Sequence, residues 1–367
     1  MAGHFPTIPS LNGIRAVSVL IVMLAHAGFG GIIPGGFGVT VFFFLSGYLI
    51  TTLLLDEYER TGSIHIPSFY IRRFFRLFPP LFLTLAIAYA LVASGLLPGG
   101  ITINGILAQI FYLANYYAIF SDTPSTIPAG TVILWSLAVE EHFYIFYPVI
   151  LLGLLALGTK RQVIGYVFAF LCVLVLAWRI YLVLQPSFVE IRTNFATDTR
   201  IDSILFGTLL ALWANPYGKA GERGRMTLQQ WCIAAAAMGV LAFTFIYRDL
   251  YFRESLRYTL QGMALFPLFY YSIRFHDNFL FRHLNSGVIG RIGVWSYSIY
   301  LLHFVAIELI ASQWRAAADR PILLFAAAAV VSIGYAAAVD AWVDPYFRRR
   351  RGSRTPAPLS KGVLGQA

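Results

Sequence analysis

Apolar stretches of about 17 to 25 residues, the length of helix that crosses a bilayer, recur along the whole chain of 367 residues. Charged residues make up only 12% of the sequence, whereas soluble domains carry roughly 25%. A soluble fold has no interior large enough for so many long apolar segments. The sequence therefore predicts an all-α membrane protein, folded as a polytopic bundle of transmembrane helices.

We expect about ten transmembrane helices from these stretches. They lie near residues 12–30, 37–55, 79–97, 134–158, 162–184, 200–214, 230–247, 257–274, 288–312 and 322–342. Residues 103–120 are diluted by polar side chains, so they form either an eleventh span or a segment along the membrane interface. The first stretch lacks the pattern of a removable signal peptide, and we interpret it as a retained span.

Basic residues predict the orientation of these spans. They lie in short clusters between the apolar stretches, which is typical of a membrane protein that follows the positive-inside rule. The net charge of +10 therefore does not indicate that the chain binds nucleic acid. If the N-terminus is cytoplasmic and residues 103–120 do not cross, the outer loops carry only Arg192, Arg248, Arg253, Arg315 and Arg320, with Arg200 and Arg257 at span edges. We therefore expect both termini in the cytoplasm. Residues 8–347 would form one integral-membrane domain, and residues 348–367 a basic, disordered cytoplasmic tail.

Ionisable side chains inside a span are costly, so each one is a functional candidate. The first span carries Arg15 and His26, which a helix would place about 16 Å apart, with the histidine toward the outer half. In the structural alternative, Arg15 reaches the lipid headgroups and His26 hydrogen-bonds a neighbouring helix. The second span is rich in glycine and contains Ser46, a pattern that indicates close helix packing.

Three arginines, Arg72, Arg73 and Arg76, are interleaved with aromatic residues just before Pro79 and Pro80. We expect them on a cytoplasmic interface helix, with the prolines at the start of the third span. Two interpretations stay open. The arginines either anchor the chain to lipid headgroups or clamp the phosphates of a soluble ligand, since guanidinium binds phosphate bidentately.

The fourth span begins with the adjacent carboxylates Glu140 and Glu141. Neighbouring residues point to different faces of a helix, so we expect at most one of them to approach His26. A carboxylate beside an imidazole is a typical general-base arrangement. The two cysteines, Cys172 and Cys232, lie in apolar spans, where we expect no disulfide or metal role.

A polar stripe marks the ninth span. Ser296, Tyr300 and His303 follow one another at spacings of four and three, which places them on one face of a helix. A polar face in lipid should point toward the bundle interior. It serves either a functional site or hydrogen bonding between helices.

Six motifs follow one another between Ile8 and Phe347. They are Leu11–His26, with ten residues between an arginine and a histidine; the glycine-rich Gly38–Ile50; Arg72–Pro79; the serine and paired glutamates of Leu134–Pro148; Asp198–Gly207; and Ser296–His303. In this order they resemble the acyltransferase 3 family of membrane acyltransferases, which includes bacterial O-antigen and exopolysaccharide O-acetylases. The chain carries no esterase-like extra domain and so resembles the stand-alone members.

Four positions depart from the family pattern. Asn12 and Thr40 stand where aspartate is usual, His142 where glutamine is common, and Val343 where glutamate is often found. The two missing aspartates leave fewer carboxylates to orient Arg15 or His26. We therefore expect Glu140 or Glu141 to orient Arg15 or His26.

The resemblance implies an acyltransferase of the bacterial inner membrane. It would move an acetyl or other short acyl group from acyl-CoA to a hydroxyl of a cell-envelope polysaccharide, a lipopolysaccharide or a lipid-linked sugar. The catalytic residues would be His26, Glu140 and Glu141, by direct transfer or through an acyl-histidine. Substrate-binding residues would be Arg15, Arg72, Arg73, Arg76, Ser136, Ser296, Tyr300 and His303. We expect no metal and no permanently bound cofactor, because acetyl-CoA is a substrate.

Two alternatives stay open. Within the same class of enzyme, the acceptor is a small lipophilic hydroxyl compound such as a macrolide. From another class, the chain is a polytopic transporter or flippase, for which buried His, Arg and Glu are equally natural. The inverted repeat of many transporters is not evident in the sequence.

Overall fold

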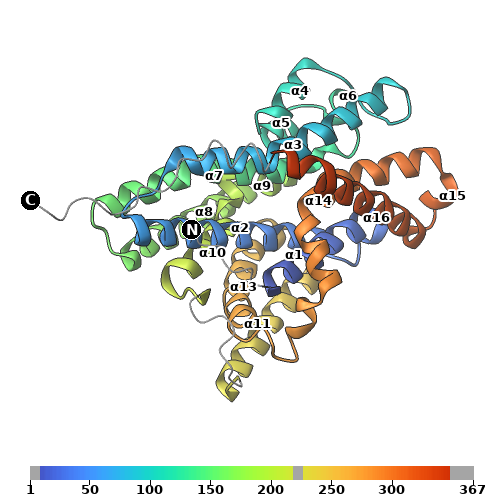
Figure 1. Ribbon diagram of the computed structural model, residues 1–367. Coiled ribbons are helices and arrows are strands. Elements are labelled where there is room, and N and C mark those ends of the chain that lie inside the picture. Colours follow the sequence, from blue (N-terminus) through green and yellow to red (C-terminus); the bar gives the residue numbers. More distant parts are fainter. Residues whose placement is uncertain (1–8, 218–225, 348–367) are drawn as a thin grey trace, which may run out of the picture.

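The computed structural model describes residues 9–217 and 226–347 as a bundle of helices (Figure 1). Within these two ranges, the β-type pairing is limited to an isolated bridge between Gly99 and Pro128. The predicted all-α class and the polytopic membrane architecture are confirmed. The expected tail of residues 348–367 lies outside the described residues.

Each of the ten predicted spans corresponds to a long helix in the described part of the chain. These helices are α1 (Pro9–Leu24), α2 (Gly35–Thr61), α3 (Ile66–Ala93), α7 (Leu134–Ala156), α8 (Arg161–Val183), α10 (Thr197–Trp213), α11 (Leu228–Ile246), α13 (Leu256–Arg274), α14 (Gly287–Gln313) and α16 (Pro321–Ala338). Eight of them are long and apolar enough to cross a membrane. The other two, α10 and α13, carry more polar residues.

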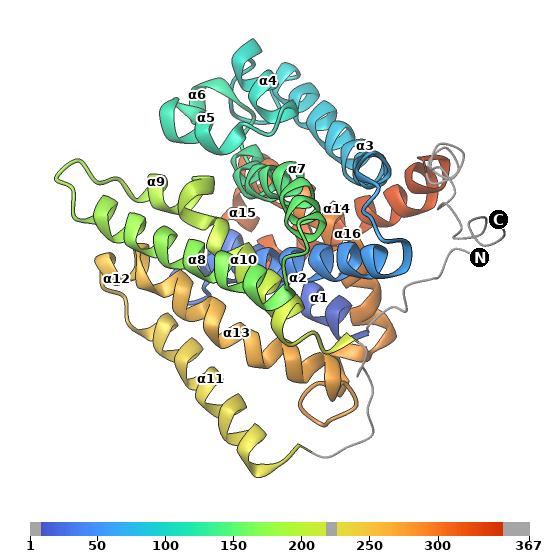
Figure 2. The same ribbon diagram turned by 90° about the vertical axis from the view of Figure 1, so that its left-hand side faces the viewer.

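Position in the bundle explains the polarity of α10. This helix packs against α2, α8 and α13, and both Arg200 and Asp202 on it are fully buried. A helix that its neighbours shield from lipid needs no apolar surface all round, so its hydropathy falls. Figure 2 shows α2 and α10 in the middle of the bundle, with α7 above them and α13 below.

Glycines allow α2 and α10 to approach closely. A Cβ atom on Gly47 would lie 1.9 Å from the carbonyl oxygen of Ile204, and one on Gly207 would lie 1.8 Å from that of Phe44. Both distances are far inside van der Waals contact, so only glycine fits at these crossings. The close packing predicted for the glycine-rich second span is therefore present.

The helix α3 differs from its prediction. It runs unbroken from Ile66 through Pro79 and Pro80 to Ala93, so the prolines do not start the span and the three arginines do not lie on a separate interface helix. Prolines inside a helix remove amide donors. Near this point the hydroxyls of Tyr297 and Tyr335 donate to the carbonyl oxygens of Leu77 and Pro80, at 2.9 and 3.0 Å. Neighbouring helices thus hydrogen-bond the backbone of α3 close to the two prolines.

Residues 103–120 form two short helices, α4 (Ile103–Ile110) and α5 (Ala114–Phe120). At 1.5 Å per residue each is about 12 Å long, which is too short to cross a bilayer. Several connecting helices complete the fold. They are η1 (Ala25–Phe29), α6 (Thr123–Thr126), η2 (Thr131–Ile133), α9 (Glu190–Phe195), α12 (Leu250–Glu254), η4 (Arg282–Asn285), α15 (Arg315–Ala318) and η5 (Val339–Val343).

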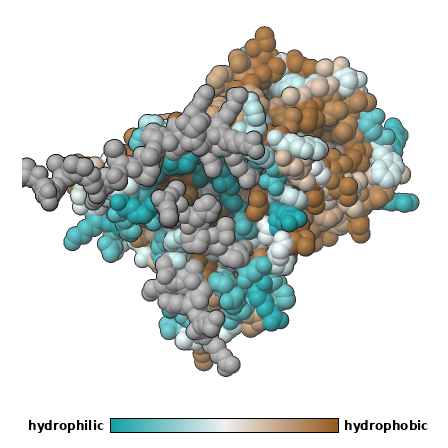
Figure 3. Space-filling view, viewed as in Figure 1, coloured by the Kyte–Doolittle hydropathy of each residue, from teal (hydrophilic) through white to brown (hydrophobic). Residues whose placement is uncertain are grey.

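Large apolar side chains are exposed on the outward faces of the long helices. Examples are Phe146 on α7, Phe170 on α8 and Met238 on α11, each more than half exposed. Figure 3 shows hydrophobic residues gathered on the right-hand part of one face, with hydrophilic residues toward the left. An apolar surface of this extent fits contact with lipid tails.

Candidate active site

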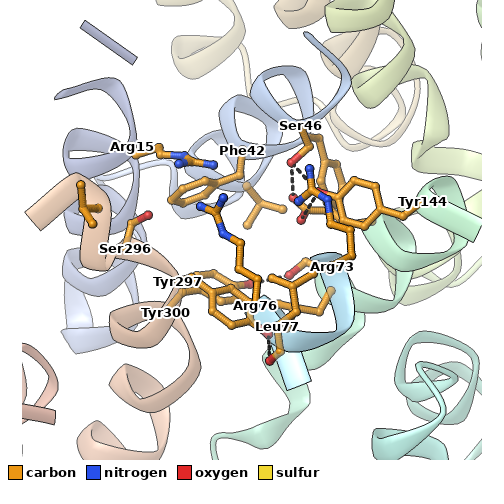
Figure 4. Close-up of a pocket in the computed structure, with 16 residues that line it drawn as sticks. Arg15, Phe42, Ser46, Arg73, Arg76, Leu77, Tyr144, Ser296, Tyr297 and Tyr300 are labelled. Atoms are coloured by element: carbon orange, nitrogen blue, oxygen red, sulfur yellow. Dashed lines mark hydrogen bonds between the residues drawn. The ribbon is translucent and has the colours of Figure 1, made fainter. Parts of the chain in front are cut away.

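A pocket of about 670 Å³, including its opening to solvent, lies between α1, α2, α3, α7 and α14. Figure 4 shows side chains from these helices converging on it. The lining residues are Arg15, Val39, Phe42, Phe43, Ser46, Arg73, Arg76, Leu77, Ser136, Leu137, Glu140, Tyr144, Val294, Ser296, Tyr297 and Tyr300. The pocket thus brings together residues from five of the six sequence motifs.

Three arginines line the pocket. Arg15 comes from α1, and Arg73 and Arg76 come from α3. In Figure 4 the side chains of Arg15 and Arg76 point into the same space beside Phe42. Arg76 is exposed whereas Arg15 and Arg73 are half-buried, so the positive charge extends from the surface inward.

The third arginine of the α3 motif lies elsewhere. Arg72 pairs with Glu57 of α2 at 3.2 Å and does not line the pocket. Successive residues on a helix point in directions about 100° apart, so α3 cannot present Arg72 and Arg73 to the same space. Arg15 completes the set of three in its place.

Ser46, Glu140 and Tyr144 are hydrogen-bonded to one another and line one side of the pocket. Ser46 donates to Oε1 of Glu140 at 3.1 Å, and the Tyr144 hydroxyl lies 3.1 Å from Oε2. The guanidinium of Arg73 covers the Tyr144 ring at 4.6 Å from its centroid, and both Arg73 and Arg15 are close enough to interact electrostatically with Glu140. The carboxylate therefore helps to position the arginines.

The second glutamate of the pair, Glu141, does not line the pocket. It lies close enough to Arg73 for an electrostatic interaction from another face of α7. The next residue, His142, points toward α10, where its Nδ1 lies 2.7 Å from the Thr197 hydroxyl. The expectation that adjacent carboxylates face different directions is met.

The polar stripe of α14 faces the bundle interior. Ser296 and Tyr300 line the pocket, and the Tyr300 hydroxyl lies 2.7 Å from the Ser136 hydroxyl of α7. His303 is fully buried about one turn farther along α14. The stripe therefore leads from the pocket toward the C-terminal end of α1.

His26 follows the C-terminal end of α1, on the short π-helix η1. Gly28 follows with φ of 108°, a conformation that favours glycine and lets the chain turn away from α1. The Nδ1 atom of His26 lies 2.9 Å from Nε2 of His303, and its ring stacks on Phe304 with centroids 4.3 Å apart. His26 does not itself line the pocket, and Tyr300 and His303 lie between the two.

These contacts correct one expectation. We expected Glu140 or Glu141 to orient His26, but the structure gives that hydrogen bond to His303. The carboxylate of Glu140 is instead used by Ser46 and Tyr144. Sequence spacing places residues along a helix but does not fix how far neighbouring helices are rotated, and this rotation decides which polar groups meet.

A buried ion pair outside the pocket was not predicted from the sequence. Arg179 of α8 and Asp202 of α10 are both 0% exposed and form two hydrogen bonds, at 2.8 and 2.7 Å. Opposite charges inside two predicted spans were a usable signal, because such groups pair in membranes. Phe42, Tyr144 and Tyr297 were also missed, since aromatic residues in apolar spans look like any other core residue.

Next to this pair, Arg200 connects two of the motifs. It is fully buried and donates to Thr40 of α2 at 3.1 Å and to the side chain of Asn194 at 3.1 Å. Its guanidinium also lies 3.9 Å from the Tyr258 ring centroid. Thr40 stands at a position where the family commonly has aspartate, so this chain binds Arg200 through neutral groups and an aromatic face.

No group of His, Cys, Asp and Glu among the described residues is arranged to hold a metal ion. Cys172 is buried and Cys232 is exposed. The pocket's chemistry consists of guanidinium, hydroxyl and carboxylate groups, with an imidazole pair beside it.

The fold and the pocket define a polytopic, all-helical membrane protein with a polar, arginine-lined cavity inside its bundle. Residues 8–340 match the family model described as an acyltransferase domain, so the chain belongs to the acyltransferase 3 family. The resemblance seen in the sequence motifs is thereby confirmed. No solved structure matches this one.

Three curated relatives place the chain within this family. A Staphylococcus aureus (strain COL) protein named "Putative O-acetyltransferase" is 33% identical over 84% of this chain and 52% of its own length. The peptidoglycan O-acetyltransferase OatA of Listeria monocytogenes is 29% identical over 82% and 50%. A Bacillus subtilis protein named "Putative peptidoglycan O-acetyltransferase" is 30% identical over 83% and 49%. The chain thus spans about half the length of these relatives.

Proposed function

We propose that this chain is an O-acyltransferase of the bacterial inner membrane that moves an acetyl or other short acyl group from acyl-CoA to a hydroxyl of a cell-envelope glycan. The pocket is the observation that carries the proposal. Arg15, Arg73 and Arg76 converge there among apolar helices. Guanidinium groups gathered in this way suit a ligand with several negative charges, such as the phosphates of coenzyme A.

The comparisons support the type of reaction. Family membership favours acyl transfer, and the names of the relatives favour acetyl as the group and a glycan as the acceptor. Peptidoglycan is one member of this acceptor class, together with lipopolysaccharide and lipid-linked sugars. Each of these carries hydroxyls at or beyond the outer surface of the membrane.

In the proposed reaction, the phosphates of acyl-CoA bind at the arginines and the thioester extends past Tyr300 toward His26. The acceptor hydroxyl gives its proton to Nε2 of His26 while its oxygen attacks the thioester carbonyl. A carbon–oxygen bond forms, the carbon–sulfur bond breaks, and the departing thiolate takes up the proton. Arg15, Tyr300 or Ser296 would stabilise the oxyanion or the departing thiolate.

A covalent route uses the same atom. Nε2 of His26 would attack the thioester carbonyl and release the thiolate. The acceptor oxygen would then attack the acyl carbon, the bond from that carbon to Nε2 would break, and the hydroxyl proton would be taken up by the thiolate. In either route Glu140 acts through its electrostatic interaction with Arg15 and Arg73, and we assign it a positioning role.

The deciding experiment measures transfer of radiolabel from acetyl-CoA to glycan in membranes that contain this chain. We expect label in a glycan fraction with the wild-type chain and a loss of at least 100-fold with His26→Ala, because the base contributes about 10²- to 10⁴-fold. His283→Ala, at an exposed histidine of η4, is the matched control and should retain wild-type transfer.

Two results would count against the proposal. Absence of label with the wild-type chain, in membranes that hold the acceptor glycan, would exclude this reaction. Full transfer by the His26→Ala variant would remove His26 from the mechanism.

A further inference from the structure

The two buried imidazoles form a chain of hydrogen bonds that ends on the backbone. Nδ1 of His26 faces Nε2 of His303 at 2.9 Å, and Nδ1 of His303 faces the carbonyl oxygen of Tyr300 at 2.6 Å. His303 is fully buried, so water does not compete for its two ring nitrogens. Every hydrogen in the chain can therefore be placed from donor and acceptor chemistry.

The carbonyl oxygen of Tyr300 only accepts hydrogen bonds, so Nδ1 of His303 must carry the hydrogen. A neutral His303 then has a lone pair on Nε2, and this atom can only accept from His26. The hydrogen between the two rings therefore belongs to Nδ1 of His26. Nε2 of His26 is left with its lone pair.

The opposite arrangement requires a charged His303. An imidazolium at His303 would be a fully buried cation. Its hydrogen-bond partners among the described residues are a backbone carbonyl and a second imidazole, and no carboxylate is among them. Such a charge is expensive inside a membrane protein. The neutral arrangement is therefore favoured.

We infer that His303 is a positioning residue that holds His26 in the Nδ1–H tautomer, so that Nε2 of His26 is the atom that takes the proton or the acyl group. This inference rests on the proposed function for its role in catalysis, but the tautomer itself does not. When Nε2 binds a proton, His303 continues to accept from Nδ1–H. The new positive charge is thus stabilised along the chain to the Tyr300 carbonyl.

Packing keeps the His26 ring in place for this role. The ring is nearly parallel to that of His303, at an interplanar angle of 6°, and it stacks on Phe304 from the same helix. No described residue donates to Nε2 of His26, so this atom is available to a ligand. Tyr300 contributes its side chain to the pocket and its carbonyl to the chain, and so links the two parts.

The first test reads the tautomer directly. Full-length protein with ¹³C,¹⁵N-labelled histidine, in lipid nanodiscs near pH 7, is examined by solid-state NMR, and the His26 signals are identified by their loss in His26→Asn. We expect a protonated Nδ1 and a bare Nε2 for His26 in the wild-type chain. A hydrogen on Nε2 with a bare Nδ1, or a doubly protonated ring, would overturn the inference.

The second test separates positioning from packing. At position 303, glutamine places its side-chain oxygen near the position of the His303 Nε2 atom, where it can accept a hydrogen bond from His26. Asparagine places its amide near the position of the His303 Nδ1 atom, from where it cannot reach His26. We expect His303→Gln to keep kcat within about tenfold, and His303→Asn and His303→Ala to lose about 100-fold or more. The KM for acetyl-CoA should change little in all three, because the arginines are untouched.

The outcomes of the two tests are distinguishable from failure of the proposed function. Equal losses in the glutamine and asparagine variants, or wild-type kcat in His303→Ala, would overturn the role of His303. If the NMR signals agree with the inference but no acyl transfer is found, the proposed function fails and the histidine pair stands. If acyl transfer is found but the NMR signals show the opposite tautomer, the proposed function stands and the inference about His303 fails.

Discussion

Two kinds of charged side chain inside this bundle differ in what they contact. Arg179 and Asp202 pair with one another, and Arg179 also donates to the carbonyl oxygens of Thr199 and Ser255 and to the Thr259 hydroxyl, which is the usual condition for charge in a membrane interior. Arg15 and Arg73 instead face a cavity and interact with Glu140 at a distance, so their remaining hydrogen-bonding capacity points into open space. That difference separates structural charge from charge that is available to a ligand.

Replacing the pocket arginines should weaken donor binding. We expect Arg73→Ala and Arg76→Ala each to raise the KM for acetyl-CoA about tenfold or more, because each removes a charge-assisted contact worth roughly 1.5–3 kcal/mol. Arg72→Ala should have a smaller effect, since Arg72 pairs with Glu57 outside the pocket. Initial rates at varied acetyl-CoA give these values, with the exposed Arg60→Ala as the control. An unchanged KM in both pocket variants would contradict the assignment.

Breaking the buried ion pair should act on stability. In Asp202→Asn the charge of Arg179 loses its counter-charge, and we expect a loss of about 3–5 kcal/mol in the free energy of unfolding. The midpoint of thermal unfolding in detergent should fall accordingly. Asp319→Asn, at an exposed aspartate before α16, should leave the midpoint unchanged. Equal midpoints for the two variants would show that the pair does not stabilise the bundle.

At the scale of helices, hydropathy predicted the long elements well because length and apolar composition are local properties. It did not predict that α3 continues through Pro79 and Pro80, because such a helix is held by contacts with other helices, such as the hydrogen bonds of Tyr297 and Tyr335 to its backbone. The pairing of His26 with His303 was unpredictable for the same reason. It depends on how α1 and α14 pack, which no single helix encodes.

The crossing of α2 and α10 gives a test at this scale. A methyl group on Gly207 would meet the backbone of Phe44, which cannot rotate away, so Gly207→Ala should push the helices apart. We expect a loss of about 1–3 kcal/mol in stability, together with weaker acetyl-CoA binding, because α2 carries Phe42 and Ser46 of the pocket. Gly239→Ala on α11 has open space and should be neutral or slightly stabilising. The midpoint of thermal unfolding and the KM for acetyl-CoA, measured for both variants, test this prediction.

For the whole molecule, the arrangement of helices places the pocket and the histidine pair at different depths. Arg76 lies toward the end of the bundle where α2 ends and α3 begins, whereas His26 lies where α1 ends and α2 begins. If the N-terminus is cytoplasmic, a donor would enter at Arg76 from the cytoplasm and an acceptor would approach His26 from the opposite side. The orientation predicted from the basic residues thus decides whether the proposed reaction can join a cytoplasmic donor to an external glycan.

Single cysteines can test that orientation. In a Cys232→Ala background, Ser125→Cys lies on α6 in the segment between α3 and α7, and Thr159→Cys lies between α7 and α8. Ser125 is exposed, Thr159 is partly exposed, and the remaining Cys172 is buried. With α3 and α7 spanning the membrane, these two sites must lie on opposite sides. We expect a membrane-impermeant maleimide to label the Ser125→Cys variant in intact spheroplasts and the Thr159→Cys variant only after lysis. The reverse pattern would place Arg76 outside, where the cytoplasmic acyl-CoA pool does not reach it, and would require a different donor.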